Sequence, residues 1–266
     1  MKKKTQLLII DPQNDFCEQK GSLWVPCANL DMQRLAIMIK NINIHLDCVH
    51  VTLDSHHLMD IAHVDFWKSD SETGIVQDFT FISHDDIKAK KYLPRQEELL
   101  LHVLDYTKYL EKKKQYPLCA WPAHCLIGSW GHNIYEPLLK ALWDAELEGI
   151  KINYISKGEN PLSEHYSAIE EEVPLSLDNN EHLNNDLLLK LSQADRLLIA
   201  GEASSHCVLL TVYSIVKYLG DDYAKKIILL EDAMSPVATH ENYQQELFDF
   251  MLGKEAKILK TTNYMK

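Results

Sequence analysis

The sequence lacks any apolar run of the roughly 18–20 residues that a membrane-spanning helix needs. Its first apolar run ends at Asp11, and this run is too short for the core of a secretory signal peptide. We therefore expect a cytoplasmic protein that neither crosses nor binds a membrane.

The sequence also lacks an excess of basic residues, since 27 lysines and arginines stand against 39 acidic residues and give a net charge of −12. This balance argues against a broad basic face, so we expect no nucleic-acid partner. Six cysteines occur at irregular spacing without a CxxC pair, which argues against a zinc ribbon or a disulfide framework. They are Cys17, Cys27, Cys48, Cys119, Cys125 and Cys207.

Short apolar runs alternate with amphipathic stretches along the chain. The runs are continuous rather than alternating in polarity, as expected of strands that are buried on both faces. They span residues 6–10, 48–53, 117–121, 152–156, 196–200, 226–230 and 256–260. The amphipathic stretches, which predict helices, span residues 30–46, 97–114, 136–147, 184–194, 208–219 and 242–252. This order predicts an α/β fold with a mainly parallel sheet and helices on both faces.

The chain shows no internal repeat and no low-complexity tract, and residues 1–266 are predicted to form a single domain. The least regular part covers about 64–116, where a mixed strand-or-loop stretch precedes a helix. We interpret it as an elaboration inserted between two core elements.

Polar residues follow several of the apolar runs, at the strand ends where parallel sheets gather their ligands. Asp11, Lys157 and Cys207 form one such set. A carboxylate can take the proton of a thiol, and a lysine near both favours their anions. Each residue also has a plain structural interpretation: a strand-end cap, a solvated lysine and an inert, packed thiol. Composition alone favours the packed thiol at Cys207.

Asp54, His56 and His124 form a second set, also near predicted strand ends. Asp-x-His places two ligands on the same side of an extended chain, and a histidine from another strand end can complete a metal site. His63 is a candidate fourth ligand or a residue above the pocket. His57 is expected to point away as a supporting or surface residue.

Five segments, in order, resemble the isochorismatase-like cysteine hydrolases and are most similar to nicotinamidases (pyrazinamidases), and a further segment, "LLEDAMSP", extends the match to about residue 240. The five segments are "LLIIDPQNDFCEQKGSLWVP", "TLDSHHLMDIAH", "WPAHCLIGSWGH", "ISKGENPLSEHYSA" and "IAGEASSHCV". The resemblance implies a Rossmann-like α/β fold and a hydrolase of small-molecule amides. It also implies a divalent metal ion, with zinc, iron and manganese all suited to the donors, and leaves a homo-oligomer open.

The resemblance assigns roles to individual residues. It implies a catalytic triad of Asp11, Lys157 and Cys207, and a metal site of Asp54, His56 and His124. It implies a cis peptide bond between Glu202 and Ala203 that turns the Ala203 and Cys207 N–H groups toward one point as an oxyanion hole. Phe16 and Trp121 match the positions that flank the substrate ring.

Several features depart from the family pattern and favour a divergent branch. The spacing from Asp54 to His124 is lengthened by the insertion, and Glu202 and Ser204–His206 replace the usual residues of the nucleophile loop. Two alternatives to a nicotinamidase therefore stay open: a hydrolase of another amide, carbamoyl or ureide compound, and a non-catalytic binding protein. Isochorismatases proper lack the nucleophilic cysteine that this chain has.

Overall fold

The computed structural model of the chain describes residues 3–41, 45–174 and 183–264. Within these residues a central six-stranded sheet has the order β10-β9-β8-β1-β2-β7, and all its neighbours pair in parallel. Its strands are β1 (Thr5–Ile10), β2 (Cys48–Asp54), β7 (Lys151–Lys157), β8 (Arg196–Gly201), β9 (Ile227–Leu230) and β10 (Lys257–Leu259). The predicted α/β fold with a mainly parallel sheet is thus confirmed.

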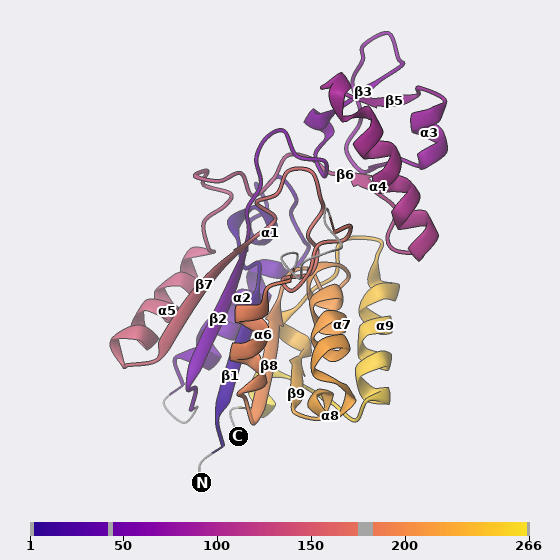
Figure 1. Cartoon of the computed structure of the whole chain (residues 1–266). Coiled ribbons are helices and arrows are strands. Elements are labelled where there is room, and N and C mark those ends of the chain that lie inside the picture. Colours follow the sequence, from indigo (N-terminus) through magenta and orange to yellow (C-terminus); the bar gives the residue numbers. More distant parts are fainter. Residues whose placement is uncertain (1–2, 42–44, 175–182, 265–266) are drawn as a thin grey trace.

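Helices cover both faces of this sheet (Figure 1). α2 (Ala28–Ile39) and α5 (Glu136–Leu147) contact each other, and α7 (Cys207–Leu219) contacts both α6 (Asn185–Ser192) and α9 (Glu241–Gly253). Right-handed crossovers place these two groups on opposite faces, because the strand order runs one way from β1 to β7 and the other way from β8 to β10. Shorter elements are α1 (Asn14–Cys17), α8 (Asp221–Ala224), η4 (Glu231–Ala233) and α10 (Thr261–Tyr264).

The segment between β2 and β7 carries a small lobe of its own, which lies at the upper right of Figure 1. Its hydrophobic cluster is separate from the main core and includes Phe66, Trp67 and Tyr106. The lobe contains η1 (Val64–Phe66), β3 (Trp67–Ser69), β4 (Thr80–Phe81), α3 (His84–Lys88), β5 (Tyr92–Pro94), η2 (Glu97–Leu99), α4 (Leu100–Lys113) and β6 (Cys119–Ala120). The proposed insertion over 64–116 corresponds to most of this lobe.

Two predicted elements differ from the structure. The run 117–121 is not a strand of the central sheet: only Cys119–Ala120 is extended, and it pairs antiparallel with Thr80–Phe81. Its apolar side chains are buried between the lobe and the core, so the hydrophobic run reflects burial rather than a core strand. The helix predicted over 30–46 ends at Ile39, before Asn41, and residues 42–44 lie outside the described part of the chain.

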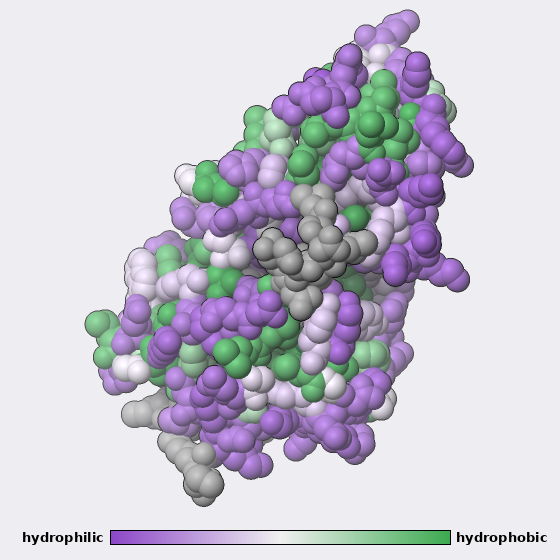
Figure 2. All heavy atoms as spheres, in the orientation of Figure 1, coloured by the Kyte–Doolittle hydropathy of each residue, from purple (hydrophilic) through white to green (hydrophobic). Residues whose placement is uncertain are grey.

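Hydrophilic residues cover most of the face shown in Figure 2, and hydrophobic ones form smaller groups. In the described ranges, no helix combines the length and the apolar character needed to cross a membrane.

Candidate active site

The carboxyl ends of β1 and β8 meet where the strand order reverses. In the sheet, β2 and β7 follow beyond β1 on one side, and β9 and β10 follow beyond β8 on the other. Asp11 directly follows β1, and the loop 202–206 leads from β8 into α7, which begins at Cys207. Such a reversal leaves a crevice in which open α/β sheets bind ligands.

Asp11, Lys157 and Cys207, predicted from distant segments, lie together in this crevice. The Lys157 Nζ is 3.0 Å from Asp11 Oδ2 and 3.7 Å from Cys207 Sγ. A carboxylate oxygen of Asp11 and the Cys207 sulfur lie within 4.8 Å of each other. The Thr52 hydroxyl donates to Asp11 Oδ1 at 2.6 Å and fixes this carboxylate from β2. All three predicted residues are buried, so Lys157 is not the solvated surface lysine of the plain interpretation.

The charges of this cluster follow from burial and mutual contact. Burial raises the pKa of the Cys207 thiol well above its usual range; Lys157 opposes this effect, while Asp11 adds to it. Burial alone would lower the pKa of Lys157, but Asp11 and Asp54 outweigh it and raise that pKa. Burial also raises the pKa of Asp11, against the opposing charge of Lys157. The resting cluster therefore holds a neutral thiol, a charged ammonium and a carboxylate of increased basicity.

Asp54, His56 and His124 converge on one side of this cluster. Asp54 Oδ2 lies 3.1 Å from His56 Nε2 and 3.6 Å from His124 Nε2. The Nδ1 atom of His56 is 2.9 Å from an Asp60 carboxylate oxygen, and that of His124 is 2.9 Å from the Pro122 carbonyl oxygen. These contacts place the Nδ1 atom of each ring against an oxygen atom and direct both Nε2 atoms at Asp54, as in metal sites. Burial would lower the pKa of His56, but Asp54 and Asp60 outweigh it and raise that pKa.

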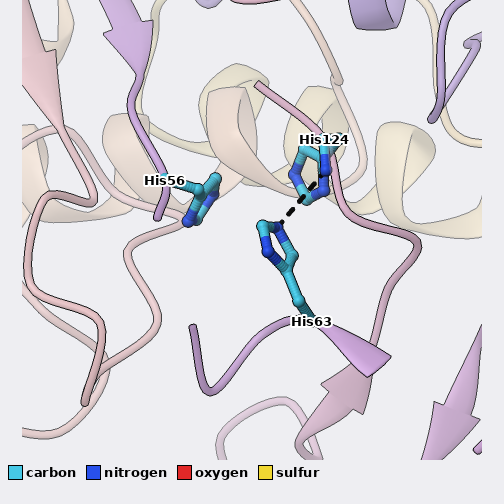
Figure 3. Close-up of side chains that lie close together, drawn as sticks. All are labelled: His56, His63 and His124. Carbon is cyan, nitrogen blue, oxygen red and sulfur yellow. Dashed lines mark hydrogen bonds between the residues drawn. The ribbon is translucent and has the colours of Figure 1, made fainter. Parts of the chain in front are cut away.

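His63 is the third histidine of this group, and Figure 3 shows its ring turned toward those of His56 and His124. One nitrogen from each of the three lies within 4.8 Å of the others. His63 Nε2 accepts the His124 backbone N–H at 3.4 Å, and burial lowers the pKa of His63 to about 2. A neutral ring of this kind can act as a ligand.

A divalent cation fits this donor set. His56 Nε2 is buried and has no hydrogen-bond partner among the described residues. Buried polar atoms are rarely left unpaired, and a cation bound beside Asp54 would bind this nitrogen. His57, next to His56, is exposed, as predicted.

A narrow cavity opens beside Cys207 and borders the histidine group. Phe16 and Trp121, predicted to flank the substrate, both line it. The Trp121 indole N–H donates to the Tyr166 hydroxyl at 3.0 Å, which fixes an aromatic wall. The complete lining is Phe16, Leu23, Val25, Asp54, Trp121, His124, Glu164, Tyr166, Ala203, His206, Cys207 and Val237.

Several of these lining residues had not been predicted individually. Glu164 and Tyr166 lie in the segment that carries Lys157, but nothing in the sequence indicated that their side chains would reach the cavity. Burial raises the pKa of Glu164 to about 7. The Glu164 backbone N–H donates to the hydroxyl of Tyr106, which belongs to α4, so the small lobe supports this wall of the cavity.

The loop before Cys207 presents two backbone donors toward the cavity. The peptide bond between Glu202 and Ala203 is cis. Within the described part of the chain, the N–H groups of Ala203 and Cys207 donate to no other protein atom. Their residues both line the cavity, so these donors are available to an oxyanion.

Comparisons with known proteins identify the fold. No protein-family model matches the chain, and no curated protein sequence matches it. A solved nicotinamidase/pyrazinamidase from Acinetobacter baumanii is similar with a TM-score of 0.66 and 18% identity, covering 99% of both chains. A pyrazinamidase from Pyrococcus horikoshii, solved in complex with zinc, has a TM-score of 0.56 and 16% identity, covering 97% of this chain and 99% of that one.

A third solved structure gives the name of the fold. An isochorismatase-like hydrolase from Alkaliphilus metalliredigens is similar with a TM-score of 0.53 and 15% identity, covering 98% of this chain and 97% of the other. The chain has the isochorismatase-like hydrolase fold. This confirms the fold that the sequence motifs implied. Along the chain, the small lobe lies between His63 and His124, which the fold brings together.

Proposed function

We propose that this protein is a metal-dependent cysteine amidohydrolase of the isochorismatase-like family, and that it converts nicotinamide and water to nicotinate and ammonia. The observation that carries the proposal is the buried Lys157 ammonium that contacts both Cys207 and Asp11 beside an aromatic-lined cavity. The names of the structurally similar nicotinamidases and pyrazinamidases support the choice of substrate.

The first half of the reaction forms a thioester. Asp11 accepts the Cys207 proton as the sulfur attacks the carboxamide carbon. The carbonyl oxygen gains the negative charge and binds the N–H groups of Ala203 and Cys207. The protonated Asp11 then donates its proton to the departing nitrogen, so that ammonia leaves as the C–N bond breaks. Lys157 keeps its charge throughout and stabilises Asp11 as a carboxylate.

The second half regenerates the thiol. A water molecule attacks the thioester carbon while Asp11 takes one of its protons. The same two N–H groups hold the second oxyanion, and the C–S bond breaks when the sulfur regains a proton. Nicotinate leaves, and Asp11 and Cys207 return to their starting protonation states.

Asp54, His56 and His124 would hold the metal ion, with His63 as the candidate fourth ligand. When bound, a zinc, iron or manganese ion supplies a Lewis acid that can orient a polar group and polarise it. The aromatic rings of Phe16 and Trp121 would contact the faces of the pyridine ring, which orients the carboxamide toward Cys207.

Ammonia release from nicotinamide tests this proposal, with the wild-type protein compared with Cys207→Ala. The variant should lose activity to background, whereas activity at the wild-type rate would rule out the mechanism. The second candidate is the hydrolysis of a different amide, carbamoyl or ureide compound, favoured by the contact of the small lobe with the Glu164 wall. A substrate panel in which nicotinamide ranks near the bottom would select it. If the protein retains no metal and iodoacetamide leaves Cys207 unmodified, the non-catalytic alternative is favoured instead.

A further inference from the structure

Two buried carboxyl groups meet on the far side of the nucleophile loop from Cys207. Glu202 follows β8 and is completely buried, and Asp31 in the first turn of α2 is 2% exposed. The two carboxyl groups lie close enough for each to act on the pKa of the other. As two carboxylates they would leave Glu202 Oε1 and Asp31 Oδ2 without a partner among the described residues. One proton between the carboxyls turns both unpaired oxygens into a donor and an acceptor.

The charges around this pair also call for one proton. Arg34 of α2 contributes one positive charge. Its guanidinium group pairs with Asp31 and also donates a hydrogen bond to the Asp232 carbonyl oxygen. From α1, Cys17 faces the pair as a neutral thiol, because burial raises its pKa well above the usual range. Burial and the nearby Asp31 likewise raise the pKa of Glu202 well above the usual carboxyl range. The Arg34 guanidinium therefore balances the charge of one carboxylate, and the second carboxyl group is buried in its protonated, uncharged form.

The Glu202 side chain is linked to the loop that carries the oxyanion donors. The Ser235 N–H donates to Glu202 Oε2 at 3.2 Å, and the Ser235 carbonyl oxygen accepts the Ser204 N–H at 2.9 Å. Two residues on, the Val237 N–H donates to Ser205 Oγ at 3.0 Å. Residues 235–237 thus hold the loop from Glu202 to Ser205, and the Glu202 carboxyl fixes their start.

We propose that Glu202 is a positioning residue: as a neutral acid that shares one proton with Asp31, it holds residues 235–237 and thereby the Ala203 N–H in place. The proposal rests on the proposed function, since the Ala203 N–H is assigned there to the oxyanion. It adds a residue that contacts no substrate and acts through the loop. A neutral side chain with the same hydrogen-bonding atoms can replace Glu202, and an apolar one cannot.

Glu202→Gln and Glu202→Met form a matched pair for the test. Glutamine can donate to Asp31 and accept from Ser235, whereas methionine has similar length and makes neither bond. We expect Glu202→Gln to keep kcat within about threefold of wild type. Glu202→Met should lower kcat at least about tenfold with little change in KM, because the oxyanion contact strengthens in the transition state. Equal kcat for Glu202→Met and wild type, or an equal loss in both variants, would overturn the proposal.

Infrared difference spectroscopy tests the shared proton without any substrate. The wild-type minus Glu202→Gln spectrum at neutral pH should contain the carbonyl stretch of a protonated carboxylic acid. A carboxylate band in its place would overturn the proposal even if nicotinamide is hydrolysed. If neither protein hydrolyses nicotinamide but the acid band is present, the proton assignment stands and the proposed function fails. The two failures are therefore distinguishable. A Glu164→Gln control identifies the contribution of the other acid near the cavity.

Discussion

Replacing Asp11 by asparagine separates its role as a base from its role as a charge. The substitution keeps the shape of the side chain and its contact with the Thr52 hydroxyl. It removes the proton acceptor for Cys207 and also a negative charge close to the sulfur. The first loss should slow turnover, while the second should make the thiolate easier to form. Asp11→Asn should therefore lower kcat and raise the thiolate fraction of Cys207.

The size of each effect follows from the geometry. Asp11, Asp54 and Cys207 each present an atom within 4.8 Å of the others. Two unit charges 4.8 Å apart repel by about 3.5 kcal/mol at an effective dielectric of 20. Because about 1.4 kcal/mol corresponds to a factor of ten, the thiolate fraction at a given pH should rise at least tenfold. Loss of general-base catalysis should lower kcat by about 10²–10⁴-fold.

Two assays on the same preparations check these expectations. Ammonia release gives kcat, and the pH dependence of iodoacetamide alkylation gives the thiolate fraction. Mass spectrometry assigns the modification, with Cys207→Ala as the blank for the other cysteines. For Asp11→Asn we expect the alkylation profile of Cys207 to move to lower pH while turnover collapses. An alkylation profile displaced to higher pH, or a kcat within tenfold of wild type, would refute the reasoning.

Two further substitutions test the charges and the metal donors. Lys157→Met leaves buried carboxylates without their cation and should lower the free energy of unfolding by about 3–5 kcal/mol in denaturant titrations. Lys140→Met removes a lysine from an exposed pair and should leave the free energy of unfolding unchanged. Equal losses of stability in the two variants would contradict the assigned contacts. His63→Ala should reduce the metal retained per chain after dialysis, measured by elemental analysis, whereas the exposed His57→Ala should retain the wild-type amount. Full metal retention by His63→Ala would remove His63 from the ligand set.

The main strands could be predicted because their burial is nearly complete. β1 and β8 lie in the middle of the sheet with helices on both faces, so each reads as an unbroken apolar run. The same rule failed for 117–121, whose apolar residues lie between two hydrophobic clusters without joining the central sheet. Continuous hydrophobicity reports burial, and only the pairing partner, far away in the sequence, decides whether a core strand forms.

The site residues were predictable to the extent that they follow strands. Asp11 follows β1, Lys157 ends β7, and Cys207 begins the helix after β8, so topology alone directs them to one edge. The sequence drew attention to Glu202 as a departure from a family pattern and as one side of the implied cis peptide bond, but gave its carboxyl group no role. Its partner Asp31 lies on a helix near the other end of the chain, and an acid facing an acid follows no simple charge rule. The pairing of Glu202 with Asp31 is recognised only from their unpaired carboxyl oxygens in the folded protein.

The strand order also explains why the cation of the cluster is a lysine from an edge strand. Asp11 and the Cys207 loop follow the two adjacent strands at the reversal of the sheet. The next residue that can reach them across β2 comes from β7, where Lys157 is in register with Asp54. A long, unbranched side chain is needed to pass Asp54 and contact both Asp11 and Cys207, and its ammonium donates to the His165 carbonyl oxygen as well. Because Lys157 Nζ also binds Asp54 Oδ1 at 2.8 Å, this one ammonium connects Asp11 and Cys207 to the carboxylate that faces His56 and His124.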